Sequence, residues 1–322
     1  MLTHRSALVV GAVAMALLGD AAKAQGYPDH PVKIVVPSPP AGSYDILGRV
    51  VADQLTKRMG QSFVVENRTG AGTVVGTKSV ATAAPDGYTL LVGGLSNMIF
   101  NAGLYKTRPY DPINDFVPVA LSLNISYSLV GSDILPQKSV AEIVAAAKQN
   151  PGALKLASAG VGTGQHVVGA AFQIATGVKF LEVPYRGSSA VFPDLIPGRV
   201  DMFFDSTPAA LPYIKSGQVK GVAILAAKRH PDWPDMPTMT ESGVPGFEID
   251  SWIGIFAPAK TPPAIIARLQ REIAAAGPEM KARFANVGGE LMDVPPEKIA
   301  AVVRADYDRW LKVIKDAGIH LD

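Results

Sequence analysis

Two similar strand-to-helix turns, far apart in the sequence, constrain the fold of this chain more than any other feature. The first is Ser38–Asp45, with the sequence SPPAGSYD, and the second is Ser158–His166, with the sequence SAGVGTGQH. Each turn follows a short apolar run and precedes a helical pattern, so the first N–H groups of the helix have no intrahelical partner. These groups and the positive end of the helix dipole attract a carboxylate or a phosphate. Two such turns predict two lobes that hold one anion between them.

Strand and helix patterns alternate around the first turn. Apolar runs predict strands over 32–36, 63–66 and 88–92. Helical patterns cover 46–59, with Asp45 as the N-cap and Gly60 past the end, and the stretch from the turn at 67–72 to residue 83. This alternation is typical of a parallel βαβαβ unit.

A second unit of the same kind begins near residue 139. It is predicted to contain helices over 140–149 and 165–175, further helices from 190 and from 207, and strands over 154–157, 179–183, 200–204 and 219–224. Two extended segments, 116–130 and 247–256, lack a helical period, and helices are predicted after them over 263–276, 278–285 and 296–317. Two extended crossings between two α/β units predict a two-lobed protein with a hinge.

The first residues have the pattern of a secretory signal. His4 and Arg5 precede an apolar stretch, 7–18, and the small residues Ala22 and Ala24 form an A-x-A cleavage site. The apolar stretch is shorter than the roughly 20 residues of a membrane span. We therefore expect cleavage after Ala24 and a mature chain that is exported to the periplasm.

Composition excludes several classes of site. The 322 residues contain no cysteine, which excludes a disulfide framework, a thiolate metal site and a cysteine nucleophile. The five histidines are not at metal-ligand spacing, and the formal net charge is +2 with no Lys/Arg block. We expect no metal, no cofactor and no nucleic-acid partner.

Ordered motifs along the chain carry a family resemblance. They are Tyr27-Pro28, 31–37 (PVKIVVP), 39–42 (PPAG) with Asp45, 65–72 (VENRTGAG), 84–90 (APDGYTL), 183–187 (VPYRG), 198–201 (GRVD) and 204–205 (FD). In these motifs the chain resembles the periplasmic solute receptors of tripartite tricarboxylate transporters, also called the Bug family. The resemblance covers essentially the whole chain after the predicted signal.

The resemblance implies both a fold and a function. The fold would be an α/β, two-lobed periplasmic binding protein, a Venus flytrap of type II-like topology with two crossover segments. Lobe 1 would comprise 25–123 and 252–322, and lobe 2 would comprise 124–251. The protein would be a monomer that closes on a small carboxylate-bearing solute and delivers it to a membrane permease. In the family, loop backbone groups and bridging water hold one ligand carboxylate between the lobes.

The chain departs from the common family pattern in the first turn. The family commonly has an aromatic residue where Ser38 stands, glycine where Ala41 stands and threonine where Tyr44 stands. The ligand therefore stays open among di- and tricarboxylates, amino acids, nicotinate-like acids and aromatic acids. A ligand sensor without a dedicated permease is an alternative function.

Candidate ligand-binding residues follow the predicted strands, where open α/β sheets bind ligands. Several have an ordinary structural alternative: Asp45 and Thr163 as helix caps, His166 as a structural histidine, Arg186 as a solvated cation and Asp205 as a turn residue. Ser96 and Asn97 are ordinary loop residue types. The full set is Ser38, Pro40, Ala41, Gly42, Tyr44, Asp45, Ser96, Asn97, Ser158, Gly162, Thr163, His166, Tyr185, Arg186, Gly187 and Asp205.

The main alternative class is a secreted α/β enzyme. The segment 160–164 (GVGTG), followed later by Glu182, superficially resembles a dinucleotide-binding turn, but Gln165 stands where G-x-G-x-x-G requires glycine. The chain has no G-x-S-x-G, S-x-x-K or H-E-x-x-H motif. A structural or adhesive envelope protein is disfavoured because strand and helix alternate throughout. We therefore expect a binding protein without catalytic residues.

Overall fold

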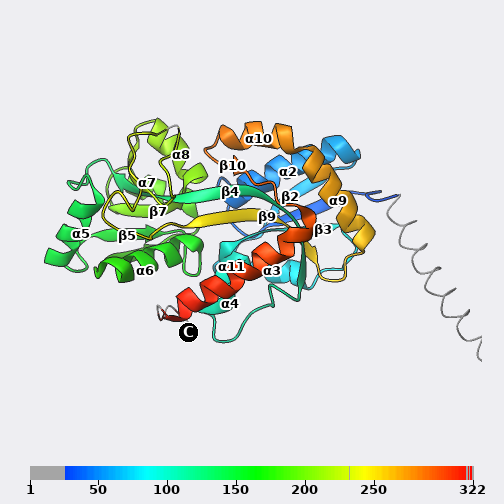
Figure 1. Cartoon of the computed structure of the whole chain (residues 1–322), viewed down its shortest axis with the longest axis horizontal. Helices are drawn as coiled ribbons and strands as arrows, with labels where there is room; N and C mark the ends of the chain where they lie inside the picture. Colours follow the sequence, from blue (N-terminus) through cyan, green and yellow to red (C-terminus); the bar gives the residue numbers. More distant parts are fainter. Residues whose placement is uncertain (1–25, 232, 317, 319, 321–322) are drawn as a thin grey trace, which may run out of the picture.

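Two α/β lobes lie side by side and are joined by two long strands (Figure 1). The computed structural model describes residues 26–231, 233–316, 318 and 320, so the predicted signal and its cleavage site lie outside the described residues. The joining strands are β4 (Phe116–Ser132) and β9 (Asp250–Pro258). The expected two-lobed α/β architecture with two crossover segments is confirmed.

The first lobe contains the predicted parallel unit. Strand β1 lies between β2 and β3 and is parallel to both. Four of the five residues of β1 are buried, as expected for an apolar strand covered on both faces. The elements are β1 (Val32–Val36), α2 (Ser43–Met59), β2 (Phe63–Asn67), α3 (Val74–Ala81), β3 (Thr89–Gly94), η1 (Ser96–Phe100) and α4 (Asn101–Leu104).

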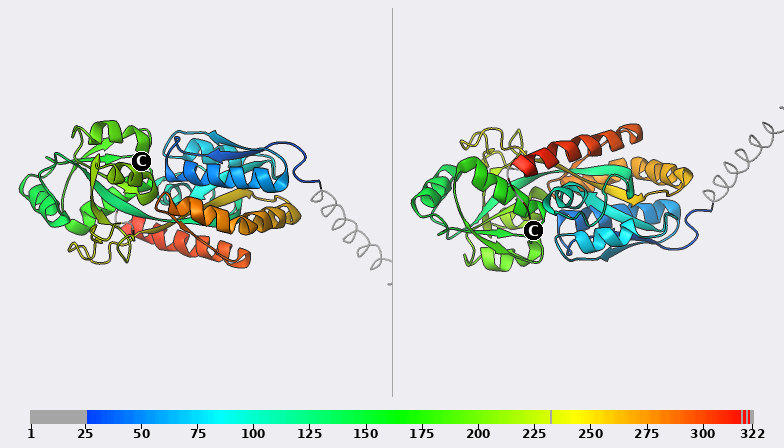
Figure 2. Two further views of the ribbon diagram at one scale, coloured as in Figure 1. Left: turned by 90° about the horizontal axis from the view of Figure 1, so that it is seen from above. Right: turned by 90° about the horizontal axis from the view of Figure 1, so that it is seen from below.

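The end of the chain returns to the first lobe. Seen from above in Figure 2, α9 and α10 lie against α2, while the last helix, α11, packs against η1, α4 and β4 and runs toward the second lobe. The late elements are α9 (Pro263–Ala275), α10 (Gly277–Ala285), β10 (Glu290–Leu291) and α11 (Pro296–Asp316). The three helices agree with the prediction to within a residue or two at their described ends.

The second lobe repeats the pattern. Strand β5 is parallel to β6 and β7, while β7 and β8 both pair antiparallel with β4. The elements are α5 (Val140–Gln149), β5 (Lys155–Ser158), α6 (Gly164–Thr176), β6 (Leu181–Pro184), η2 (Ser188–Ala190), α7 (Phe192–Leu195), β7 (Met202–Ser206), α8 (Thr207–Lys215) and β8 (Val219–Ile224).

The crossing strands join both lobes into one ten-stranded sheet, with the order β2-β1-β3-β9-β4-β7-β5-β6 along its main path. Strands β4 and β9 pair antiparallel from Phe116 opposite Pro258 to Ser126 opposite Asp250. Beyond that point β4 continues into the second lobe and pairs there with β7 and β8. The predicted lobe boundaries fall within this paired segment, where Asn124 faces Trp252.

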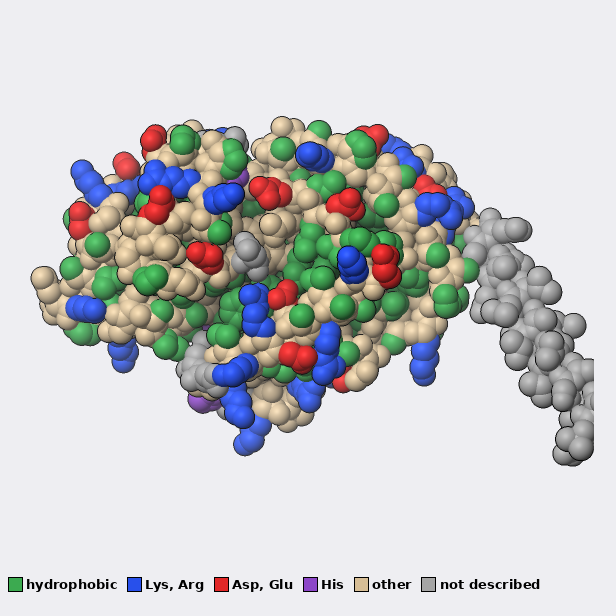
Figure 3. Space-filling model, in the orientation of Figure 1, with side chains coloured by type: hydrophobic (Ala, Val, Ile, Leu, Met, Phe, Trp, Pro, Cys, Tyr) green, Lys and Arg blue, Asp and Glu red, His purple; other side chains and the backbone are tan. Residues whose placement is uncertain are grey.

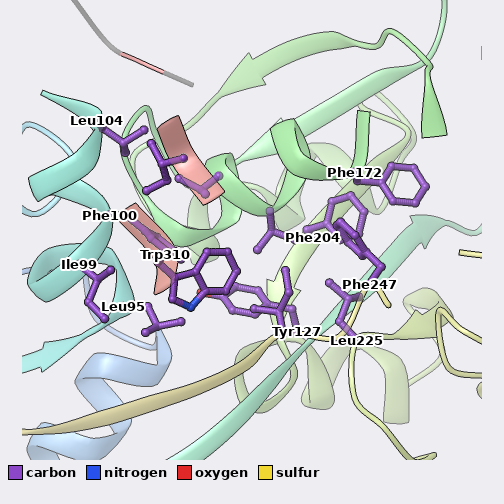
Figure 4. Close-up of a cluster of buried hydrophobic side chains, with 14 of the residues drawn as sticks. Leu95, Ile99, Phe100, Leu104, Tyr127, Phe172, Phe204, Leu225, Phe247 and Trp310 are labelled. Carbon is purple, nitrogen blue, oxygen red and sulfur yellow. The ribbon is translucent and has the colours of Figure 1, made fainter. Parts of the chain in front are cut away.

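One buried cluster extends beneath the junction of the lobes (Figure 4). On the first-lobe side, Phe100 packs edge-on against Trp310 of α11. On the second-lobe side, Phe172 contacts both Phe204 and Phe247. The side chain of Tyr127, on β4, belongs to the same cluster. The two lobes therefore share one buried core at their junction.

Two local predictions are wrong. Helix α2 begins at Ser43 with Gly42 as its N-cap, so Asp45 is not the cap but lies in the first turn. Its carboxylate instead accepts the N–H of Ala41 at 3.0 Å, which braces the turn from inside the helix. Ser96 and Asn97 were expected in a loop, but both are buried in the π-helix η1. The Asn97 amide is satisfied there because it donates to Thr77 Oγ1 and accepts the N–H of Gly94.

Candidate functional site

A cavity of about 540 Å³ lies between the two lobes. Its wall is formed where β1, β2 and β3 of the first lobe and β5, β6 and β7 of the second lobe end, together with part of β4. The predicted site residues that line it are Ser38, Pro40, Gly42, Tyr44, Ser96, Thr163, Tyr185, Arg186 and Gly187. Both turns of the sequence analysis therefore contribute to one cavity.

The start of α2 presents unpaired donors to this cavity. Within the described part of the chain, the N–H groups of residues 42–45 have no hydrogen-bond acceptor, and Gly42 gives no side-chain cap. The hydroxyl oxygen of Ser38 is buried without a partner beside them. The positive end of the helix dipole adds to these donors, so this turn favours an anion.

A second set of donors comes from the loop after β2. Residues 70–73 all have positive φ, from 46° at Ala71 to 138° at Gly70, and their N–H groups make no hydrogen bond to any described residue. The side chain of Asn101 holds the loop by donating to Gly72 O and to Thr73 Oγ1, both at 3.0 Å. Successive N–H groups on a curved loop form a concavity that binds anions.

Asn67 connects the loop to the first turn. Its side-chain amide donates to Ser38 O at 3.0 Å and to Asp45 Oδ1 at 2.9 Å. Arg49 donates to the other oxygen of Asp45 at 2.8 Å. Burial raises the pKa of Asp45, but hydrogen bonds from Arg49, Ala41 and Asn67 outweigh it and leave the pKa below its usual value. The Asp45 carboxylate therefore stabilises the turn through hydrogen bonds to protein groups. Asp45 does not line the cavity.

The start of α6 offers fewer free N–H groups to a ligand than the start of α2. Thr163 is the N-cap and accepts the N–H of His166 at 3.4 Å, while the N–H of Gly164 donates to Ser96 Oγ at 2.8 Å. In the first turn this leaves the N–H of Gln165 without an acceptor among the described residues. The two turns look alike in sequence, but the first offers the larger set of free donors.

Direct contacts hold the lobes together around the cavity. Ser43 Oγ of the first lobe donates to Ser206 Oγ of the second at 2.6 Å, and both side chains are buried. The bond from Gly164 to Ser96 is a second interlobe bond. Gly187, with φ 102°, packs so closely on Pro39 that a Cβ would lie 2.5 Å from the proline ring.

Substitution of Ser43 by alanine is expected to weaken ligand binding two- to tenfold, because a net hydrogen bond of about 0.5–1.5 kcal/mol between the closed lobes is lost. Thermal unfolding should change little. Titration calorimetry measures the affinity, with Ser79→Ala as the control, since Ser79 Oγ donates to Gly76 O within one helix of the first lobe. Equal affinity in Ser43→Ala and Ser79→Ala would contradict a role for the interlobe bond.

Among the described residues, Arg186 is the one Lys or Arg that lines the cavity. Its side chain is exposed and makes no ion pair with a described residue. The adjacent Tyr185 donates its hydroxyl to Asp194 at 2.8 Å. No Asp or Glu side chain lines the cavity in the described part of the chain, so its lining is suited to a ligand with negative charge.

Asp205 lies just behind the cavity wall. It is fully buried, and its Oδ1 accepts from Gln165, from Ser188 and from the N–H of Ser206, while Oδ2 has no partner. Burial raises the pKa of Asp205 to about 6. The carboxylate therefore positions three lining residues rather than facing the cavity itself.

The other predicted residues support the turns. His166 lies outside the lining, where Nδ1 accepts the N–H of Gly162 at 3.5 Å and Nε2 lies 3.6 Å from Glu182. The predicted residues that do not line the cavity are Ala41, Asp45, Asn97, Ser158, Gly162, His166 and Asp205.

Sequence reasoning missed part of the lining. The loop 69–73 follows a parallel strand adjacent to β1, so the rule that identified the first turn could have identified this loop. Tyr127 and Ile125 lie on the crossing strand, for which that rule gives no signal. The missed lining residues are Pro37, Pro39, Ser43, Asn67, Thr69, Gly70, Ala71, Gly72, Thr73, Ile125, Tyr127, Ala159, Gly160, Val161, Gln165, Ser188 and Ser206.

The described residues contain neither a metal-binding cluster nor a helix that could span a membrane. No group of three or more His, Asp or Glu side chains there could hold a metal ion. None of the helices within that part of the chain has the length and apolar character of a bilayer span. On the face shown in Figure 3, basic and acidic side chains are interspersed over both lobes, without a continuous basic surface.

The chain is similar in sequence to known proteins over most of its length. A family profile described as "Tripartite tricarboxylate transporter family receptor" matches residues 47–319. Protein BugT of Bordetella pertussis is 34% identical over 319 residues, covering 98% of each chain. A Pseudomonas sp. protein from the tcbD-tcbE intergenic region is 35% identical over 312 residues, which are 95% of this chain and 93% of the relative.

Solved structures share the fold. An R. palustris protein with adipate has a TM-score of 0.87 and 35% identity, covering 92% of this chain and 100% of that one. The periplasmic binding protein BugD has a TM-score of 0.86 and 34% identity, with the same coverage. MatC from Rhodopseudomonas palustris with bound malate has a TM-score of 0.85 and 31% identity, covering 89% of this chain and 100% of that chain.

Proposed function

The chain belongs to the tripartite tricarboxylate transporter receptor family, and we propose that it is a solute receptor whose lobes close on a small carboxylate-bearing molecule. The observation that carries the proposal is that two groups of backbone N–H donors without acceptors, those of residues 42–45 and of residues 70–73, lie at one cavity. Among the described residues, no Asp or Glu side chain lines this cavity. Two oxygens of a carboxylate can accept several such donors at once. The bound adipate and malate of structural neighbours support the same ligand class.

We place the mature chain in the periplasm after cleavage behind Ala24, as a monomer that passes its solute to membrane permease subunits. It has no catalytic role in this proposal. The lobes are 25–123 with 252–322, and 124–251, and they bend within the paired segment of β4 and β9. The family profile supports the permease partner, and the mixed charge on the one face shown in Figure 3 agrees with our proposal of no nucleic-acid partner.

Carboxylates are expected to raise the melting temperature, whereas the matched amides are not. A receptor at a ligand concentration of a hundred times Kd gains about 2.7 kcal/mol. For a chain of this size the gain corresponds to several degrees. The measurement is a thermal-shift panel of mono-, di- and tricarboxylates with their amides, followed by mass spectrometry of the recovered acid.

Two outcomes would contradict the proposal. Amides that stabilise as well as acids would show that the free N–H groups do not select an anion. Chemical conversion of the acid would favour the enzyme alternative. If acids stabilise the protein but a transport assay in cells shows no uptake that depends on it, the sensor alternative gains support.

A further inference from the structure

Tyr127 reaches the cavity from the strand that connects the lobes. It lies on β4 opposite Ser206 of β7, its carbonyl oxygen accepts the N–H of Leu225 at 2.8 Å, and its side chain belongs to the buried cluster of Figure 4. The residue is only 4% exposed, yet it lines the cavity. Its hydroxyl lies against Gly164, where any Cβ would overlap the hydroxyl oxygen. Glycine at the first position of α6 therefore makes room for this phenol.

The hydroxyl of Tyr127 makes no hydrogen bond with a described residue. The other two tyrosines that line the cavity have engaged hydroxyls: Tyr44 donates to Asn97 Oδ1 at 3.2 Å, and Tyr185 donates to Asp194 Oδ2 at 2.8 Å. The Tyr127 hydroxyl oxygen is not among the enclosed side-chain atoms that lack a partner, so it is open to the cavity, where a ligand acceptor can reach it. Tyr127 is thus a donor directed into the cavity and left unused by the protein.

The surroundings of this hydroxyl disfavour a negative charge. The lining residues nearby carry no positive charge: Ser96 and Ile125 are buried, and Tyr44 is partly buried. Asp205 precedes Ser206, the residue that pairs with Tyr127, and lies behind Gln165 and Ser188. A second ligand carboxylate near Tyr127 would meet the charge of Asp205 without a compensating cation, and a buried unpaired charge is unfavourable. A neutral acceptor meets no such repulsion.

We propose that Tyr127 donates a hydrogen bond to a neutral oxygen of the ligand, and so selects monocarboxylates that carry a keto, ether or hydroxyl oxygen. This inference rests on the proposed function, because the ligand carboxylate occupies the N–H groups of 42–45 and 70–73. It adds a specificity determinant that neither turn supplies.

The test compares acids that differ in one neutral oxygen. Titration calorimetry measures 4-oxopentanoate, pentanoate, succinate and adipate against the wild type and Tyr127→Phe. The wild type is expected to bind the keto acid about tenfold more tightly than pentanoate, since a site built to bond an oxygen rejects the analogue that lacks it. Tyr127→Phe is expected to bind both acids equally.

A matched variant removes another buried tyrosine hydroxyl. Tyr27 donates to Gly87 O at 2.7 Å in the first lobe and does not line the cavity. Tyr27→Phe should lower the melting temperature and retain the preference for the keto acid. Tyr127→Phe should not lower the melting temperature, because no protein hydrogen bond is lost.

Each contrary result has a distinct meaning. If Tyr127→Phe keeps the wild-type preference, or if succinate or adipate binds the wild type more tightly than the keto acid, the inference is wrong and the proposed function stands. A marked loss of stability in Tyr127→Phe with unchanged selectivity would assign the hydroxyl a structural role. If none of the acids binds the wild type, the proposed function fails as well.

Discussion

Replacement of Gly72 by alanine is expected to lower affinity for carboxylates roughly ten- to a hundredfold. Gly72 lies on the first-lobe loop, and a Cβ there would overlap the carbonyl oxygen of Val161 in the second lobe and lie 3.2 Å from Gly162 Cα. Both neighbouring atoms are backbone, so the overlap is relieved only if the lobes separate. Overpacking of this kind costs about 1–3 kcal/mol in the closed conformation. Titration calorimetry with the best acid of the thermal-shift panel measures the loss.

Gly60 provides a matched control for backbone strain. It has φ 72°, close to the 57° of Gly72, but no heavy atom lies within 4 Å of a Cβ at this position. Both alanine variants should therefore lose about 1 kcal/mol of stability from the left-handed conformation. Only Gly72→Ala should lose affinity. Equal affinities in the two variants would mean that the loop does not approach the second lobe when ligand is bound.

Lowering the pH from 7 to 5 is expected to stabilise the protein by about 1 kcal/mol through Asp205. Burial raises the pKa of this carboxyl to about 6, so the folded protein binds a proton over a pH range in which the unfolded chain does not. The stabilising contribution is complete below the unfolded pKa, ~3.8, and is lost as the pH rises through the folded pKa. Carboxyls whose pKa is lowered in the folded protein, such as Asp45, have the opposite effect: they lower the free energy of unfolding as the pH falls, and they do so only at more acidic pH. The free energy of unfolding should therefore be greatest near pH 5.

Asp205→Asn removes the titrating group and retains an oxygen for the three donors. Its free energy of unfolding should be nearly independent of pH between 7 and 5, whereas that of the wild type should rise toward pH 5. Chemical denaturation at several pH values measures both. A wild type that loses stability over the same range would contradict the burial of an ionised Asp205.

Local pattern predicted the elements, because buried parallel strands are continuous apolar runs and their helices have a clear period. Val32–Val36 and Val140–Gln149 are found at their predicted bounds for this reason. The start of α2 was misplaced because Asp45 is a strong capping residue type, whereas Gly42 caps through its extended backbone alone. Asn97 could not be predicted as helical, since its bonds to Thr77 and Gly94 depend on tertiary packing.

The site was predicted in part, because strand ends in a parallel sheet converge. That rule located the two turns and Arg186 on one cavity. It could not show that Ser96, distant in sequence, already uses the N–H of Gly164, nor that Ser43 bonds Ser206. Those contacts exist only because the lobes meet, and they make two similar sequences unequal as anion sites.

A crystal structure of the protein with the tightest-binding acid of the panel tests the central claim most directly. We expect a ligand carboxylate between the lobes, with its oxygens about 2.7–3.2 Å from N–H groups of both 42–45 and 70–73. An acid held by Arg186 alone at the rim would contradict this account. So would an acid bound in the separate groove of about 430 Å³ between α10 and β4, lined by Met280 and Leu121.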